Sequence, residues 1–520
     1  MAGVSGASAR PSRPPRPHRP GEPQGGTAHG GAAHGEERTA NSARGTTRSA
    51  TPCPFRARPD GTRRPLSTQE EPMTVHQRVT AASAALAAVC AVTVLSPAGA
   101  SAAPTAVPHT ERVSVGPGGA EGNAASTNPA ISADGRYVAF VSASRNLVAN
   151  DTNGTPDAFV RDLRTGKTER VSVKSNGKAS HGVVREVSLS PDGRYVVFTS
   201  TADDLVRGDP NDLDDVFLHD RSTGKTQRIS PTGAAYDGLR SHLTYDPAVS
   251  GDGRYVAYAS GAEDLVAGDA NKRDDVFLYD RKKKTTELAQ LTNAGGQGEG
   301  DAFAPAFAGD AGGRYLAFTS NASNLADVED HASATDIFLR DREEGTTELI
   351  SIPRAYNRKT PSWGAVLSGD ARYVAFTSAS RVLRPEGPPP TGSRNVFLYD
   401  RETKRMRLVS AAPDGTPANG ESGDVSLSRD GRYAVFTSAA SNLAPAEDGD
   451  SSADVFLRDM QTGEVRLISA ESEPVSEDTE PGRRTGVSED GGAVVFDSPA
   501  GNLVPGDTNS AADVFLRRLR

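Results

Sequence analysis

The sequence predicts an all-β fold: a seven-bladed β-propeller whose blades are four-stranded antiparallel sheets. Three observations predict it: one phrase of about ten residues occurs seven times, a second phrase follows each copy, and the order of phrases is permuted at the two ends of the chain. Self-similarity at a fixed period of this length is typical of repeat architectures, in which each repeat forms one supersecondary unit.

The first phrase most often reads Ser-x-Asp-Gly-Arg-Tyr-Val-Ala-Phe-Thr-Ser. Its Asp-Gly pair is typical of a tight hairpin turn, because glycine accepts the positive φ that such a turn needs. The run that follows is too short for a helix and apolar on both faces, so it indicates a strand packed between two neighbouring sheets. Successive copies lie 58 or 60 residues apart, with the turn aspartate at Asp134, Asp192, Asp252, Asp310, Asp370, Asp430 and Asp490.

The second phrase, Asp-Val-Phe-Leu-x-Asp-Arg, predicts the third strand of each unit, and a third phrase such as residues 168–172 predicts the fourth. In the second unit we expect strands at residues 195–200, 216–220 and 226–230. Four-stranded units that repeat radially make a β-propeller.

The two ends of the chain predict how the ring closes. The last unit stops after its third strand, and the missing fourth phrase stands instead at residues 110–115. Pairing residues 110–115 as an outer strand beside residues 514–516 would close the ring and leave no open sheet edge there. An open solenoid gives no reason for this permuted order. We therefore expect a closed seven-bladed propeller over residues 103–520.

The first 102 residues are expected to lie outside this fold. Residues 1–72 are rich in Pro, Gly, Ser and Arg, a composition that predicts disorder. Because a signal-like segment begins only at Met73, we expect that the start codon was assigned too early and that translation begins at Met73. A genuine disordered extension is the alternative. Residues 73–102 have the layout of a secretory signal peptide, with a basic start, an apolar stretch and a small-residue cleavage site. We therefore expect a secreted protein, free or associated with the cell surface, without membrane insertion after cleavage.

Charge and cysteine content exclude several classes of function. Both cysteines, Cys53 and Cys90, precede residue 103, so the expected mature chain has no disulfide, zinc–thiolate site or cysteine nucleophile. Residues 104–520 carry 46 Lys and Arg against 61 Asp and Glu. Such an acidic chain disfavours nucleic acids and anionic membranes, and suits cations. We expect a monomer that binds a protein or a glycan.

At this point the phrases can be compared with a known repeat. Residues 190–200 followed by residues 215–217 resemble the TolB-type, WD-like propeller repeat, and the resemblance extends over residues 110–520. It implies the propeller fold but no particular function, because propellers carry many unrelated ones. TolB has an α/β domain before its propeller, and propeller peptidases add a catalytic domain. We expect neither domain here, and hence no Tol-system role.

The connection between the second and third strands carries the pattern Asp-x-Asn-x-x-x-Asp in most units. Several oxygen ligands on a short turning loop suit a hard cation, and calcium is the candidate ion. The same side chains also suit a turn held by hydrogen bonds to its own backbone, so a purely structural role stays open. The fourth unit is degenerate and the fifth has lost the pattern. The candidate ligands are Asp151, Asn153, Asp157, Asp209, Asn211, Asp215, Asp269, Asn271, Asp275, Asp448, Asp450, Asp454, Asp507, Asn509 and Asp513.

No catalytic motif is found: there is no His-Glu-x-x-His and no Gly-x-Ser-x-Gly, and the histidines do not recur at one repeat position. The favoured function is a non-catalytic binding or scaffold propeller, and no catalytic residue is assigned. A propeller enzyme, such as a lyase or glycan-active protein with a central-channel site, and a structural cell-surface protein are the alternatives. Function is expected where the blades differ. The fifth unit, with Trp363, differs most, although core packing is the favoured role of Trp363.

Overall fold

The computed structural model describes residues 108–209, 213–230, 244–309, 312–327, 334–351, 360–383, 394–444, 453–469 and 484–520. The expected extension, residues 1–72, and the expected signal peptide, residues 73–102, lie outside these ranges. The described residues belong to one compact unit, and the fold below is that of this unit. Within the described ranges, no helix has the length and apolar character needed to cross a membrane.

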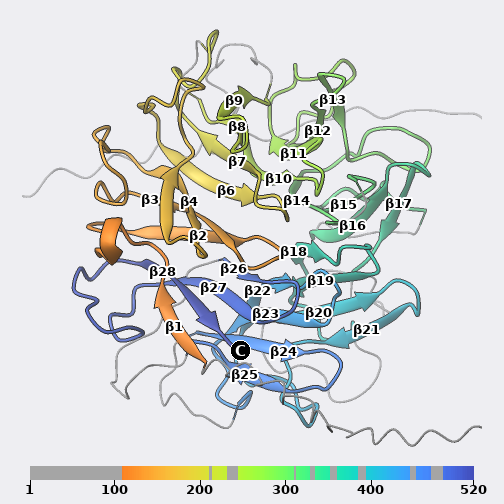
Figure 1. Ribbon diagram of the computed structural model, residues 1–520. Helices are drawn as coiled ribbons and strands as arrows, with labels where there is room; N and C mark the ends of the chain where they lie inside the picture. The colour runs from red at the N-terminus through yellow and green to blue at the C-terminus, as the bar shows by residue number, and fades with distance from the viewer. Residues whose placement is uncertain are drawn as a thin grey trace, which may run out of the picture. The chain divides into compact units, whose positions relative to one another are not determined.

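Seven four-stranded antiparallel sheets are arranged radially as the blades of a β-propeller (Figure 1). The innermost strand of each blade contacts the innermost strand of the next. The ring is closed, because β2 contacts β6 on one side and β26 on the other. The innermost strands are β2 (Ser126–Ile131), β6 (Val184–Leu189), β10 (Thr244–Val249), β14 (Ala302–Phe307), β18 (Ser362–Leu367), β22 (Ser422–Leu427) and β26 (Thr485–Val487).

The second strand of each blade comes from the first sequence phrase and is buried almost throughout, as its apolar pattern on both faces predicts. An aromatic side chain near its middle stacks on the phenylalanine of the third strand, for example Phe198 on Phe217 with ring centroids 5.8 Å apart. The second strands are β3 (Tyr137–Ser142), β7 (Tyr195–Ser200), β11 (Tyr255–Ser260), β15 (Tyr315–Ser320), β19 (Tyr373–Ser378), β23 (Tyr433–Ser438) and β27 (Ala493–Ser498).

The third and fourth strands complete each blade. The third strands are β4 (Asp157–Asp162), β8 (Asp215–Asp220), β12 (Asp275–Asp280), β16 (Asp336–Asp341), β20 (Asn395–Asp400), β24 (Asp454–Asp459) and β28 (Asp513–Arg518). The outer strands are β5 (Lys167–Arg170), β9 (Lys225–Arg228), β13 (Thr285–Leu288), β17 (Thr346–Leu349), β21 (Arg405–Leu408), β25 (Val465–Leu467) and β1 (His109–Arg112). A short 3-10 turn, η1 (Pro117–Gly119), follows β1.

Blade 7 joins the two ends of the propeller, as the permuted phrases predict. In this blade the order is β1-β28-β27-β26, and β1 runs antiparallel to β28 with Thr110 opposite Arg517 (Figure 1). The backbone N–H of Val113 extends the pairing by donating to the carbonyl of Val514 at 2.7 Å. The predicted pairing of residues 110–115 with residues 514–516 is thus confirmed, although regular pairing ends near Val113, where the chain turns.

The side chains of the first phrase build the turn that precedes the second strand. Ser190 Oγ donates to Asp192 Oδ1 at 2.5 Å, and the same carboxylate oxygen accepts the backbone N–H of Arg194 at 3.0 Å. Gly193 has φ of 70°, the left-handed region that the turn requires. The phrase therefore recurs because each polar residue satisfies a backbone group of this turn.

The same phrase also joins each blade to its neighbour. A Cβ added to Gly193 would lie 2.3 Å from Tyr137 Cδ2 of the preceding blade, and Arg221 lies over the Tyr137 ring at 4.3 Å. We call these arginine–tyrosine contacts between blades the inter-blade stack. It forms at four of the seven joints, as Arg221 on Tyr137, Arg281 on Tyr195, Arg342 on Tyr255 and Arg401 on Tyr315. The arginine is replaced by an aliphatic side chain in the remaining blades, by Met460, Leu519 and Leu163.

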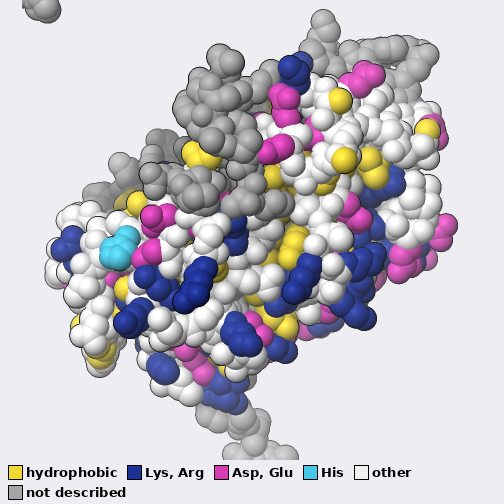
Figure 2. All heavy atoms as spheres, turned by 90° about the horizontal axis from the view of Figure 1, so that it is seen from above, with side chains coloured by type: hydrophobic (Ala, Val, Ile, Leu, Met, Phe, Trp, Pro, Cys, Tyr) yellow, Lys and Arg dark blue, Asp and Glu magenta, His cyan; other side chains and the backbone are white. Residues whose placement is uncertain are grey.

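Many surface arginines lie in ion pairs between hairpin turns. In blade 2, Arg194 Nη2 lies 2.9 Å from Asp220 Oδ2, and five other blades repeat the pair. Figure 2 shows Lys and Arg side chains gathered over the lower half of that view, with Asp and Glu beside them. The acidic composition therefore does not produce a uniformly acidic surface.

Candidate functional site

The predicted metal ligands lie in the loop between the second and third strands of each blade. The last residue of the pattern begins the third strand and is buried in every blade. A side chain at the end of the outer strand donates a hydrogen bond to it, which ties the loop to the blade edge. These pairs are Ser172 with Asp157, Ser230 with Asp215, Gln290 with Asp275, Ser351 with Asp336, Ser410 with Asn395, Ser469 with Asp454 and Ser114 with Asp513.

In blade 1 an arginine lies between the two acids of the pattern. Arg170 Nη1 lies 3.0 Å from Asp151 Oδ1 and 3.2 Å from Asp157 Oδ2. The middle residue, Asn153, donates through Nδ2 to Asp157 Oδ2 at 2.8 Å and to the carbonyl of Ser180 at 2.9 Å. The guanidinium thus takes the position between the carboxylates that a metal ion would take. Blade 2 repeats the arrangement, with Arg228 Nη1 2.7 Å from Asp209 Oδ1 and 3.6 Å from Asp215 Oδ2; Asn211 lies outside the described residues.

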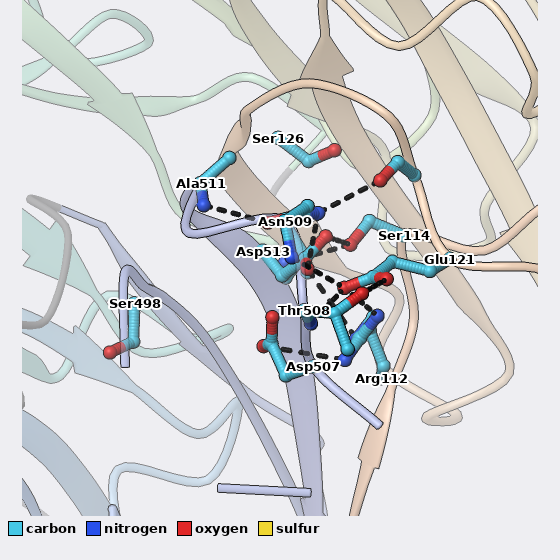
Figure 3. Close-up of polar contacts among 12 residues, drawn as sticks. Arg112, Ser114, Glu121, Ser126, Ser498, Asp507, Thr508, Asn509, Ala511 and Asp513 are labelled. Carbon is cyan, nitrogen blue, oxygen red and sulfur yellow. Dashed lines mark hydrogen bonds and ion pairs between the residues drawn. The ribbon is translucent and has the colours of Figure 1, made fainter. Parts of the chain in front are cut away.

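Blade 7 has the same arrangement with a third acid (Figure 3). Glu121, Asp507 and Asp513 bring carboxylate oxygens within 4.8 Å of one another. Arg112 contacts all three, at 2.9 Å from Glu121, 3.3 Å from Asp507 and 3.4 Å from Asp513. Asn509 donates to the carbonyl of Gly122 at 2.8 Å. Because Arg112 and Glu121 precede β2 and the two aspartates flank the start of β28, the cluster holds together the segments that close the ring.

The pKa values in blade 7 reflect burial opposed by these hydrogen bonds. Burial raises the pKa of Asp507 to about 6 and also raises the pKa of Asp513, while Arg112 acts in the opposite direction. Hydrogen bonds from the backbone and hydroxyl of Thr508 lower the pKa of Glu121 to about 2. The contacts of Arg112 with the three acids thus form an ion-pair network inside the fold.

Blade 3 departs from this arrangement. The arginine position of the outer strand is Leu288, and the amide Nε2 of Gln297 lies between the acids instead, 2.8 Å from Asp269 Oδ1 and 3.1 Å from Asp275 Oδ2. Asn271 donates to Asp275 Oδ1 at 3.1 Å. Burial and the neighbouring charge of Asp269 raise the pKa of Asp275 to about 7. A neutral amide has thus replaced the guanidinium while both acids are kept.

The remaining predicted ligands are in blade 6, where Asp448 and Asp450 lie outside the described residues and Asp454 accepts a hydrogen bond from Ser469 at 2.6 Å. Calcium binding by these loops stays a prediction. The geometry nevertheless separates the loops into two kinds, those that contain an arginine and those that do not.

A second polar cluster lies in the central channel, a cavity of about 490 Å³ lined by the innermost strands of all seven blades. One position differs in chemistry from blade to blade. It lies three residues before the last residue of each innermost strand, as Glu186 does before Leu189. The residues at this position are Asn128, Glu186, Asp246, Ala304, Gly364, Asp424 and Arg484.

The backbone turns at this channel position. Five of the seven residues there have positive φ, between 49° and 65°, and the pairing with the second strand shifts register beside them. A bulge of this kind bends the strand and leaves backbone groups free for side chains of other blades. The N–H of Asp246 donates to Glu186 Oε2 at 2.7 Å, and the N–H of Ala304 donates to Asp246 Oδ2 at 3.0 Å.

Arg484 of blade 7 reaches across the channel to the acids of blades 2 and 3. Its Nη2 lies 3.3 Å from Glu186 Oε1 and 3.9 Å from Asp246 Oδ1. Burial raises the pKa of both Glu186 and Asp246, and Arg484 acts in the opposite direction. The three side chains therefore form a charged group inside the channel.

Asp497 places a buried carboxylate behind this group, although it does not itself line the cavity. It stands on β27 where the second strands of blades 2, 4, 5 and 6 have threonine, and it is 4% exposed. Its carboxylate accepts hydrogen bonds from the backbone of Asn128 and of Arg484, and burial raises its pKa to about 7. Its Oδ1 has no hydrogen-bond partner among the described residues. An incompletely satisfied buried acid is costly and calls for a specific explanation.

Trp363 differs from expectation. It is partly exposed and lines the channel cavity, so it does not fill a blade core. Sequence reasoning missed the channel residues Glu186, Asp246 and Arg484. A signal was available, because the residue at this repeat position varies in charge and size from blade to blade.

The comparisons with known proteins agree with the fold. No family model matches the chain, and no curated protein matches it. Among solved structures it is similar to an oligogalacturonate lyase from Vibrio parahaemolyticus, with a TM-score of 0.46 and 11% identity over 80% of this chain and 98% of that chain. It is similar to TolB from Acinetobacter baumannii, with a TM-score of 0.33 and 16% identity over 70% of this chain and 76% of that chain.

A third similar structure is the β-propeller domain of the Trilobed protease from Pyrococcus furiosus, with a TM-score of 0.45 and 12% identity over 76% of this chain and 96% of that one. These proteins have different functions, and similarity at this level concerns the fold alone. The described chain is a seven-bladed β-propeller with a polar channel by its own strand pairing, and its function has to be argued from its own residues.

Proposed function

We propose that this chain is a secreted, non-catalytic binding propeller that holds its ligand in the central channel beside Glu186, Asp246 and Arg484. The observation that carries the proposal is Asp497. A threonine at this position suffices for the fold in four other blades, whereas Asp497 is buried, has a raised pKa and leaves one oxygen unpaired. Asp497 does not itself line the cavity, but a buried, perturbed acid directly beside a concave site makes that site a candidate for ligand contact.

The chemistry around Asp497 supports recognition of a polar ligand. Arg484 and the acids opposite it offer a donor and acceptors within one cavity, and Trp363 and Thr377 also line it. Ligand sites commonly combine an apolar wall with a few convergent polar groups. The charged residues come from blades 2, 3 and 7, but Arg484 lies 3.3 and 3.9 Å from the two acids, so one polar group of a ligand could contact all three.

A binding screen tests this function directly. The purified full chain is passed over immobilised glycans and peptides, and hits are measured by calorimetry. For a channel ligand we expect Arg484→Gln to weaken binding at least tenfold. Arg185→Gln is the matched control, because the Arg185 side chain pairs with Asp214 and does not line the cavity. Binding that Arg484→Gln leaves unchanged, or no binder at all, would contradict a channel site.

The same screen separates the alternatives. Turnover of a bound glycan or peptide that is lost in Glu186→Gln would replace the binding function by the propeller-enzyme alternative. Cell fractionation addresses localisation: the proposal expects the chain in the medium or loosely at the surface, whereas retention in the wall after salt extraction would favour a structural protein.

A further inference from the structure

We propose that the loop of blade 3 binds one divalent metal cation of the calcium type between Asp269 and Asp275. This inference is independent of the channel function. It concerns blade 3, whose loop has both acids but not the arginine that lies between them in blades 1, 2 and 7.

The other blades act as internal controls for the geometry. In blade 1, Arg170 Nη1 contacts one oxygen of each acid, at 3.0 and 3.2 Å. In blade 3, Gln297 Nε2 makes the equivalent contacts, at 2.8 and 3.1 Å, with Asp269 and Asp275. Among the described residues, no lysine or arginine forms an ion pair with Asp269 or Asp275. The two loops carry the same acids, but in blade 3 no guanidinium lies between them, and the loop cations Lys272 and Arg273 form no ion pair with either acid among the described contacts.

A buried amide beside the acids has an unused oxygen. Gln290 replaces the serine of the other blades, is fully buried, and donates through Nε2 to Asp275 Oδ1 and, at 3.0 Å, to the carbonyl of Gly300. Its Oε1 has no hydrogen-bond partner within the described structure. Because Oε1 and Nε2 share one carbon, rotation of this amide would turn the oxygen toward Asp275. That orientation is unfavourable beside a carboxylate and becomes favourable when a cation lies between them.

A cavity lies next to the site. It has a volume of about 750 Å³, is lined by Gly268, Leu288 and Gln297, and extends to Arg340 and Arg342 of blade 4. Gln297 contacts both acids, whereas the acids themselves do not line the cavity. Rotation of the Gln297 side chain would therefore let water from this cavity complete a coordination shell.

The available oxygens suit a calcium-type ion. Two carboxylates, the side-chain oxygens of Gln290 and Gln297 after amide rotation, and water together approach the six to eight oxygens that calcium takes. Among the described residues, no cysteine or histidine forms a cluster with the two acids, which disfavours zinc and copper. With only two acids, we expect weak binding, at a Kd of about 0.1–1 mM.

Calcium itself is the probe for the experiment. Equilibrium dialysis of the full chain against radioactive calcium gives the number of ions bound per chain, and calorimetric unfolding gives the midpoint with calcium and with EDTA. Leu288→Arg restores the guanidinium of blade 1, so we expect it to bind one calcium ion fewer and to have a higher midpoint in EDTA. Leu288→Gln is the control without charge, and it should bind as the unchanged chain does.

A second variant tests the inference from the opposite direction. Arg170→Leu recreates the blade 3 arrangement in blade 1, and we expect it to gain up to one bound calcium ion. Blade 6 also combines acids, Asp448, Asp450 and Asp454, with a leucine at the arginine position, Leu467, but its loop lies partly outside the described residues. A calcium ion bound there would add to the total. The measured quantity is therefore the difference in bound calcium between each variant and the unchanged chain. The proposal is overturned if the unchanged chain binds no calcium at 5 mM, in which case the acids share a proton. It is also overturned if Leu288→Arg binds as many ions as the unchanged chain.

Discussion

Replacing Asp497 by threonine should stabilise the propeller and weaken ligand binding at the same time. Threonine is the residue of blades 2, 4, 5 and 6 at this position, so the substitution introduces a side chain that the fold already accommodates. The folded-state pKa of Asp497 is raised from 3.8 to about 7 by burial. The folded state therefore holds a proton that the unfolded state releases between about pH 4 and pH 7.

The size of the effect follows from this shift. One pKa unit corresponds to about 1.4 kcal/mol, so a shift of about three units destabilises the fold by at most about 4 kcal/mol above pH 7. The cost decreases as the pH falls and is absent below about pH 4, where both states are protonated. Asp497 also accepts hydrogen bonds from Asn128 and Arg484, and their loss offsets about 1 kcal/mol each. We expect a net gain of about 1–3 kcal/mol at pH 8.

Urea unfolding at pH 8 and pH 5 measures this gain. We expect Asp497→Thr to raise the unfolding midpoint at pH 8 and to lose most of the advantage at pH 5. The reverse change in blade 5, Thr377→Asp, should destabilise the chain with the same pH dependence. A gain that is equal at the two pH values, or a loss at pH 8, would refute the reasoning that a charged Asp497 is unfavourable in the fold.

Three further predictions follow from the blade contacts. Gly193→Ala should lower the free energy of unfolding by about 2–4 kcal/mol, because alanine must adopt φ of 70° and its Cβ would lie 2.3 Å from Tyr137 Cδ2. Gly224→Ala is the control, because Gly224 has a similar φ but no atom near its added Cβ. Equal urea midpoints for the two variants would contradict the contact with Tyr137. Arg112→Met should destabilise the ring by about 3–5 kcal/mol, because it leaves the blade 7 acids without a cation. Thermal unfolding should show this loss shrinking toward pH 5, because Asp507, with a pKa of about 6, is then protonated. Asp280→Asn should cost about 1 kcal/mol or less at pH 7, because the pair with Arg254 is partly solvent-exposed. Hydrogen bonds from Arg254 lower the pKa of Asp280 to about 2, so the stabilisation by this pair is present above about pH 4 and is lost as the pH falls toward 2. Acid unfolding of Asp280→Asn and of the unchanged chain is followed by circular dichroism. Identical unfolding curves would mean that the pair contributes nothing.

The fold could be predicted because its strongest signals are local and repeated. The turn of Ser190, Asp192 and Gly193 is made by residues close in sequence, and the second strand is buried on both faces and so is apolar throughout. The closure of the ring was predictable for another reason. The fourth phrase is missing at one end of the chain and present at the other, and the pairing of β1 with β28 completes it.

The candidate sites depended on contacts between distant residues. The arginine of the third phrase was visible in the sequence as part of a strand, but its position between Asp151 and Asp157 depends on the pairing of β5 with β4. The contact between Glu186 and Arg484 joins residues 298 positions apart and requires the closed ring. The bulges that turn this channel position inward leave no mark in composition, because residues as different as Asn128 and Ala304 adopt the same positive φ.

The inter-blade stack also determines where the ring is expected to open in solution. Joints that carry an arginine over a tyrosine gain about 0.5–1 kcal/mol each over purely aliphatic ones. The joint between blades 7 and 1 has Leu163 beside Ala493, the smallest pair, and the joints on either side of blade 6 are aliphatic as well. Transient separation of neighbouring blades should therefore concentrate there, and hydrogen–deuterium exchange should be fastest in β26 and β2 and slowest in β10 and β14. Local separation of blades 7 and 1 would then open the ring without global unfolding and would give a large ligand access to the channel.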